Sequence, residues 1–108
     1  LEEKPFDVYK TINDVMDLVS RQADERGIKV EQTIEIEHRK LLGSSLYLKR
    51  MLMNILSNAV KYTGEGGNIS CTLNQYPGEK EGWSVLELII ADNGIGMSEE
   101  FQRQRNRR

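Results

Sequence analysis

The sequence has 108 residues, the size of one small domain, and its composition is that of a folded chain. Leu, Ile, Val and Phe make up about a quarter of it, above the roughly 20% below which a charged chain tends to stay disordered. No apolar run approaches the ~18 residues of a membrane span, and the first residues do not resemble a signal peptide. A single cysteine, Cys71, excludes an internal disulfide, and alongside one histidine it argues against a metal cluster. We therefore expect a reducing, cytoplasmic environment.

Charge is spread unevenly along the chain. Residues 1–102 contain 11 Lys and Arg against 17 Asp and Glu, and four arginines follow among the last six residues. The acidic body argues against nucleic-acid binding. The basic end is either an RNA-binding arm or a solvated terminus, and the lack of aromatic residues among its arginines favours the second. We expect no nucleic-acid partner.

The first half of the chain predicts two helices with a strand between them. The first helix is expected from near Asp7 to Gly27, because apolar residues recur there at helical spacing: Val8, Ile12, Val15, Met16 and Val19. In the strand that follows, apolar residues share one parity, with Gln32 as the one interruption: Ile28, Val30, Ile34 and Ile36. Residues 37–44 form a connection with room for a short strand. Ser44 or Ser45 then caps a second helix that ends near Tyr62, with one apolar face: Leu48, Leu52, Ile55 and Ala59.

The second half predicts a hairpin followed by a helix. Strands are expected at 68–76 and 84–91, and the turn residues 77–82 between them favour antiparallel pairing. Residues 85–91 are nearly all apolar, which is typical of a strand covered on both faces. Ser98-Glu99-Glu100 has the pattern of a helix start, with an N-cap and two acids in the first turn. The element order predicts a two-layer α/β fold with a mixed, mainly antiparallel sheet.

One polar stripe lies on the second predicted helix. At about 100° per residue, Asn54, Asn58 and Lys61 fall within about 60° of one another, beside the apolar face. Amide oxygens suit a Mg²⁺ ion that also keeps waters and phosphate oxygens. The lysine can answer phosphate charge, and Tyr62 can lie against a base or ribose. The alternative to a binding site is that these residues are the solvated boundary of an ordinary helix. The stripe alone does not decide between the two interpretations.

A second polar motif, Asp92-Asn93-Gly94-Ile95-Gly96-Met97, follows the apolar strand directly. A carboxylate at a strand end followed by two glycines can accept a hydrogen bond while the backbone comes close to a flat ligand. The alternative is a hairpin turn, since Asn-Gly is a strong turn dipeptide. Because residues 98–102 do not read as a returning strand, we expect the ligand site. A third glycine and a Gly-Lys-Ser/Thr sequence are both missing, which excludes a dinucleotide fingerprint and a P-loop.

Together the two motifs resemble the N box (residues 52–63) and the G1 box (residues 92–97) of the ATP-binding domain of sensor histidine kinases. That family shares a superfamily, and the Bergerat ATP-binding fold, with DNA gyrase, Hsp90 and MutL. Pro5-Phe6-Asp7-Val8 also resembles the segment that follows the phosphoacceptor helices in such kinases. The resemblance covers residues 5 to about 101, and it is specific because two motifs agree in order and spacing.

The resemblance implies a role for each matching residue. Asn54 and Asn58 would coordinate Mg²⁺, Lys61 would contact phosphate, and Tyr62 would lie along the nucleotide. Asp92 would accept a hydrogen bond from the adenine amino group, Gly94 and Gly96 would allow close approach of the ring, and Met97 would also belong to the nucleotide-binding residues. In the gyrase and Hsp90 relatives a glutamate at the place of Asn54 is the general base for water, and an asparagine takes up no proton near neutral pH. The resemblance therefore implies phosphoryl transfer to a histidine rather than hydrolysis.

The chain departs from the family pattern in two places. It stops about a dozen residues after the G1 box, so the ATP lid and the second glycine box have no counterpart, and nothing matches the phosphoacceptor motif. His38 lacks that motif's context, and we expect a solvated loop histidine. We therefore expect residues 1–108 to form a single partial domain that is not active alone and contains no catalytic residue of its own. The expected partners are the dimerisation and histidine-phosphotransfer domain of the same protein and a response regulator, in the cytoplasm whether or not the parent carries a membrane anchor.

Two further expectations follow. A strand as apolar as 85–91 would be left with an uncovered neighbour, so we expect a marginal monomer that pairs with a second copy or exchanges elements with it. The alternative functions are an ATPase of the same superfamily and a non-catalytic interaction module that keeps the fold.

Overall fold

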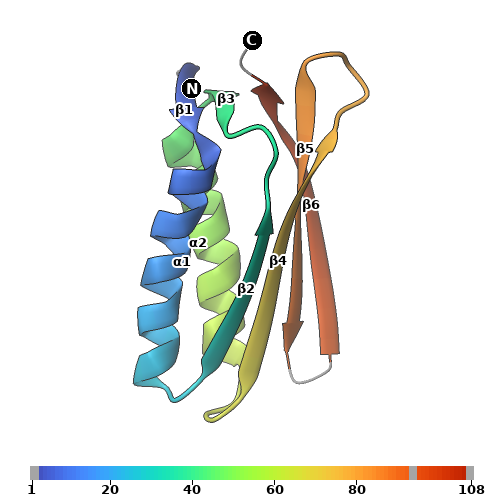
Figure 1. Cartoon of the computed structure of the whole chain (residues 1–108). Coiled ribbons are helices and arrows are strands. Elements are labelled where there is room, and N and C mark those ends of the chain that lie inside the picture. Colours follow the sequence, from blue (N-terminus) through green and yellow to red (C-terminus); the bar gives the residue numbers. More distant parts are fainter. Residues whose placement is uncertain (1–2, 93–94, 107–108) are drawn as a thin grey trace.

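Two helices cover one face of a six-stranded sheet in the computed structural model of the chain (Figure 1). The structure describes residues 3–92 and 95–106, with side chains described as far as residue 92. The elements in chain order are β1 (Lys4–Asp7), α1 (Val8–Glu25), β2 (Lys29–Glu35), β3 (Lys40–Gly43), α2 (Ser45–Tyr62), β4 (Asn68–Pro77), β5 (Trp83–Asp92) and β6 (Ile95–Asn106). The strand order is β1-β3-β6-β5-β4-β2, in which β2 and β4 are parallel and all other neighbours antiparallel. The expected two-layer fold with a mixed, mainly antiparallel sheet is confirmed.

Both ends of α1 have the signals that the sequence predicts. Asp7 is the N-cap, and its side chain accepts a hydrogen bond from the backbone N–H of Lys10 at 3.1 Å. At the other end the N–H of Gly27 donates to Asp24 and the N–H of Ile28 donates to Ala23, at 3.0 and 2.9 Å. Gly27 has φ +67°, the left-handed conformation that this type of helix stop requires. The turn leaves Arg26 at the very end of the helix.

The Asp7 cap predicts a pH dependence of stability. The backbone N–H of Lys10 lowers the pKa of Asp7, and the Arg39 guanidinium, 3.1 Å away, lowers it further. Because this pKa is lower in the folded state, the contribution is full above the unfolded pKa of about 4 and is lost as the pH falls through the folded-state value. We expect Asp7→Ala to cost about 1 kcal/mol at pH 7 in urea unfolding. Asp7→Asn keeps the capping oxygen, so its stability should change less than the wild type's between pH 6 and pH 3; equal changes would contradict the assignment.

The core lies between the helices and the sheet, and α2 buries more of its surface than predicted. Ser44 caps this helix by accepting from the N–H of Tyr47 at 3.1 Å. Ile55, expected in the core, is only partly buried. The buried residues are Leu48, Leu52, Leu56, Ala59 and Val60. Because α2 packs against α1 and also shares one core cluster with β4 and β5 (Figure 1), its buried stripe is wider than one apolar row.

The β4–β5 hairpin is confirmed, but β5 is covered on one face only. Leu86, Leu88 and Ile90 are buried toward the helices. Ile89 points to the opposite face and is 36% exposed, and on the same face the Glu87 carboxylate accepts hydrogen bonds from Asn74 and Tyr76. The expectation of two covered faces was therefore wrong, because a mostly antiparallel sheet can leave one face to solvent even where that face carries apolar residues.

The predicted helix at Ser98 is also wrong. Residues 95–106 form β6, which pairs with β5 from Asp92↔Ile95 to Trp83↔Arg105. A buried strand needs partners for the backbone groups on both edges, and β6 supplies those that β4 cannot reach. This demand overrides the local helix signal of Ser98-Glu99-Glu100. The strand β6 is the returning strand that residues 98–102 were not expected to form, so that ground for rejecting an Asn-Gly hairpin was wrong; residues 93 and 94 lie outside the described residues.

The strand β6 changes the expectation about exposed edges. Since β6 pairs with β5, the predicted uncovered neighbour of β5 is not found, and the sheet ends instead at β1 and β2. The marginal monomer and its pairing with a second copy stay predictions. In the part of the chain that the structure describes, neither helix is long and apolar enough to cross a membrane.

Candidate functional site

The polar stripe of α2 is on the surface, as its spacing predicts. Asn54, Asn58 and Lys61 are all exposed, while the neighbouring Leu56 and Val60 are buried. Residues four apart lie one above the other on a helix, so the two amides share a face. The stripe thus offers two neutral oxygen donors and a cation on a rigid element, beside the core.

Tyr62 completes the last turn of α2. The residue is 76% exposed, which is high for an aromatic residue at the edge of a core. The ammonium of Lys61 lies 5.5 Å from the centroid of the Tyr62 ring. A contact of that length is a cation–π interaction worth about 0.5–1 kcal/mol at an exposed site. The pair therefore offers a flat apolar surface and a positive charge side by side.

Asp92 ends β5 and is held by the residue that follows α2. The hydroxyl of Thr63 lies 2.7 Å from Asp92 Oδ2 and equally 2.7 Å from the carbonyl oxygen of Ala59. The other carboxylate oxygen, Asp92 Oδ1, is buried, and no side chain or backbone group among the described residues donates to it. A buried acceptor without a donor costs about 1–3 kcal/mol, so this oxygen is set up to receive a hydrogen bond from a ligand.

Arg26 ties α1 to the same place. Its guanidinium donates to the carbonyl oxygen of Val60 and, at 3.0 Å, to that of Thr63. These are carbonyls at the C-terminal end of α2, where the helix dipole is negative and a cation is favourable. Sequence reasoning missed this residue, because nothing in the run Glu25-Arg26-Gly27 indicates a partner 34 residues away. Figure 1 shows the two helix ends beside one another at the bottom of the view.

The structure places the remaining predicted residues as follows. Gly94 lies outside the described residues. Gly96 and Met97 lie in β6, opposite Ala91 and Ile90, and their side-chain surroundings are not described. His38 is exposed between β2 and β3, where its N–H donates to the side chain of Gln75, so the expected solvated loop histidine is confirmed.

The stripe and Asp92 are joined by the end of α2. Nine residues separate Asn54 from Thr63, which is about 13 Å along a helix that rises 1.5 Å per residue. A single ligand that reaches both must therefore be elongated, with an amino donor at the Asp92 end and oxygens that suit a cation at the Asn54 end.

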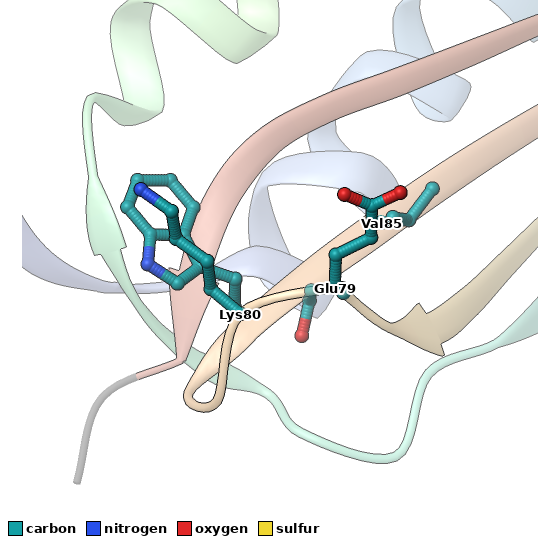
Figure 2. Close-up of a pocket in the computed structure, with 6 residues that line it drawn as sticks. Glu79, Lys80 and Val85 are labelled. Carbon is teal, nitrogen blue, oxygen red and sulfur yellow. The ribbon is translucent and has the colours of Figure 1, made fainter.

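A cavity at the far end of the sheet is a different place. It has a volume of about 200 Å³ and lies at the β4–β5 turn, lined by Gly78, Glu79, Lys80, Trp83, Ser84 and Val85 (Figure 2). Eight residues of β5 separate Ser84 from Asp92, which is about 27 Å at 3.4 Å per residue. The cavity therefore shares no wall with the polar stripe or with Asp92.

Comparison with known sequences gives one consistent result. The sequence profile described as histidine kinase-, DNA gyrase B- and HSP90-like ATPase matches residues 43–107. The histidine protein kinase DivJ of Caulobacter vibrioides is 30% identical over 100 residues, which cover 93% of this chain. They cover only 16% of DivJ, so this chain corresponds to a small part of its relative.

Solved structures with the same arrangement include a sensor histidine kinase. A mycobacterial sensor histidine kinase, MprB, aligns with a TM-score of 0.61 at 27% identity, over 82% of this chain and 53% of that one. Full-length ShkA in complex with AMPPNP aligns with a TM-score of 0.64 at 26% identity, over 82% of this chain and 18% of that one.

Proposed function

The chain belongs to the family of histidine kinase-, DNA gyrase B- and HSP90-like ATPases, as a catalytic domain of the sensor histidine kinase type, and from that premise we propose that it binds Mg²⁺-ATP and supplies the γ-phosphoryl group to a histidine on a separate dimerisation domain. The observation that carries the proposal is the unpartnered, buried Asp92 Oδ1 beside the end of α2. ShkA, a structural relative, was solved with the ATP analogue AMPPNP, which supports a nucleotide as the ligand.

Asp92 selects the base in this proposal. The amino group of adenine donates to Oδ1, which gives that oxygen the donor it lacks within the described residues. Guanine presents a carbonyl at the same position, and two facing acceptors repel each other and stay unpaired. We assign Gly94, Gly96 and Met97 to the same base-binding end of the site, because a glycine has no Cβ to keep the backbone away from a flat ring. The exposed ring of Tyr62 lies along the nucleotide.

The stripe of α2 receives the phosphates. Asn54 and Asn58 offer amide oxygens, a donor type that Mg²⁺ accepts, and their shared helix face fits that ion. The ion, when bound, would offset the negative charge of the phosphate oxygens. Lys61 adds a positive charge that can move from the Tyr62 ring to a phosphate. The polar groups thus order the nucleotide from base to phosphate along one helix.

Asn54 favours a histidine over water as the acceptor of the phosphoryl group. A carboxamide takes up no proton near neutral pH, so this residue does not activate water as a glutamate would. A histidine imidazole is itself a nucleophile: its nitrogen attacks the γ-phosphorus while the bond to the bridging oxygen breaks and ADP leaves. The acceptor histidine in this proposal belongs to another domain, because His38, in the loop between β2 and β3, lacks the sequence context of the phosphoacceptor motif. A cytoplasmic response regulator receives the group afterwards.

Removal of the Mg²⁺ ligands tests the phosphate end. We expect Asn58→Ala to weaken ADP binding about tenfold or more when Mg²⁺ is present and to change it little in EDTA, since the lost interaction passes through the ion. Isothermal titration with and without Mg²⁺ measures both values. Ser57→Ala, one residue away on the same helix, is the matched control, because its hydroxyl donates to Gln22 instead. An equal loss with and without Mg²⁺ would show that Asn58 is not an ion ligand.

A further inference from the structure

We propose that Thr63, held in place by Arg26, sets the base selectivity of the site by fixing the Asp92 carboxylate. This inference rests on the proposed nucleotide function, and it assigns a positioning role to two residues that carry no such role in either motif. The structural basis is a chain of hydrogen bonds that runs from the end of α1, through the end of α2, to the end of β5.

The two oxygens of Asp92 are in unequal surroundings. Oδ2 lies 2.7 Å from the Thr63 hydroxyl, whereas Oδ1 has no donor among the described residues. A carboxylate held by one oxygen cannot turn freely about its last torsion, so the bare oxygen keeps one direction. Hydrogen bonds to a charged acceptor are shorter and stronger than neutral ones. Thr63 therefore determines which oxygen is left for the ligand and where it points.

Thr63 itself is fixed by its position. It is 1% exposed, it is the C-cap of α2, and its backbone N–H donates to Ala59 at 3.1 Å. A hydroxyl has one proton, so Thr63 donates either to the Ala59 carbonyl or to Asp92 at a given moment. Both acceptors lie at the same distance, and the hydroxyl therefore stays between them. A serine can do the same, whereas a valine has the shape but no proton to donate.

Arg26 holds the backbone that carries this hydroxyl. Arg26 follows the last residue of α1, and its guanidinium donates hydrogen bonds to the carbonyl oxygens of Val60 and Thr63 at the end of α2. Arg26 is partly buried. The planar fork of an arginine suits two acceptors at once, which the single ammonium of a lysine does not match. Without these bonds the end of α2 loses two of its partners, and a frayed last turn would let Thr63 move away from Asp92.

Base selectivity follows from a fixed carboxylate. ADP presents an amino donor at the 6-position of its ring, while inosine diphosphate presents a carbonyl there and an N–H beside it. A carboxylate held by Thr63 meets the inosine carbonyl and repels it. A released carboxylate can turn toward the neighbouring N–H and accept from that group instead. Loss of the Thr63 hydroxyl should therefore weaken the binding of ADP and weaken the binding of inosine diphosphate less.

The experiment compares ADP and inosine diphosphate, each with Mg²⁺, by isothermal titration well below the unfolding midpoint. For Thr63→Val we expect ADP to bind about tenfold more weakly and the preference for ADP over inosine diphosphate to fall by a similar factor. Thr63→Ser should restore both to within about twofold of the wild type. A merely structural role for Thr63 would lower the unfolding midpoint and leave the preference of the folded protein unchanged, and that result would overturn the proposal.

A variant of Arg26 provides a second test of the proposal. Arg26→Met keeps the apolar stem and removes the donors, and we expect it to reduce the preference in the same direction as Thr63→Val. Arg21→Met removes an exposed arginine from the same helix and is the matched control. If Thr63→Val does not fold, Arg26→Met decides: an unchanged preference overturns the role of the network. If the wild type binds no ADP, the proposed function is overturned as well. If the wild type binds ADP, Asp92→Ala does not, and Thr63→Val keeps the preference for ADP, only this inference is overturned.

Discussion

Replacing Asp92 by alanine is expected to remove nearly all the stabilisation that ADP and Mg²⁺ give to this chain. A ligand at about 100 times its Kd adds roughly 2.7 kcal/mol to the folded state. For a domain of about 100 residues that corresponds to a rise of roughly 10–20 °C in the unfolding midpoint. The variant keeps the fold but offers no acceptor to the adenine amino group. Thermal unfolding of both proteins with and without the ligand measures the difference.

The same variant has a second, opposite effect that sharpens the test. Without ligand, the wild type holds a buried oxygen with no donor among the described residues, and removing such a group relieves a cost of about 1–3 kcal/mol. Thr63 loses an acceptor in exchange, but the Ala59 carbonyl remains 2.7 Å away. We therefore expect ligand-free Asp92→Ala to be as stable as the wild type or more so. Asp24→Ala, on the exposed surface of α1, is the control that should keep the full response to ADP. A full response in Asp92→Ala would refute the adenine assignment.

Leu88→Ala should strongly destabilise the fold. Leu88 is 0% exposed and lies at the centre of β5, where it faces the core beneath both helices. Truncation of a buried leucine costs about 2–5 kcal/mol, because contacts are lost and a cavity is left. That is a large share of the 5–15 kcal/mol that stabilises a typical domain. Urea unfolding with the midpoint and slope fitted together measures it.

The neighbouring residue is the matched control for this change. Ile89 lies on the same strand but on the opposite face, where it is 36% exposed. Its truncation to alanine removes a similar volume from a partly solvated surface, so we expect a loss of about 1 kcal/mol or less. Equal losses at the two positions would show that the outer face of the sheet is covered in solution, and would contradict the one-sided core described above.

Local signals predicted the helices and the hairpin well, because recognisable cap or turn residues mark where these elements begin or end. Asp7 and Ser44 are N-caps that the sequence makes recognisable, and Gly27 is the left-handed stop after α1. The turn at 77–82 fixed the pairing of β4 with β5. These features depend on neighbours within a few residues, which is why a single sequence is enough to find them.

Long-range features were less accessible. The pattern Ser98-Glu99-Glu100 favours a helix locally, but the free edge of β5 requires a strand partner, and no local rule contains that requirement. The short strand β1 was missed for the same reason, since its partner β3 lies more than 30 residues away. At the site, the sequence predicted the exposed stripe on α2, while the hydrogen bonds of Thr63 and Arg26 depend on how three element ends meet in space.

The position of β6 in the sheet determines how this chain can be assembled during synthesis. β6 lies between β3 and β5, and it alone connects the β1–β3 pair to the other three strands. It is also the last of these strands to leave the ribosome. The β1–β3 pair and the strands β2, β4 and β5 therefore stay unconnected until residues 95–106 emerge. Such a late closure by a distant segment favours slow folding and exposes the edges of β3 and β5 in the meantime. Nascent chains that stall before residue 95 should accordingly be the forms that most need a chaperone.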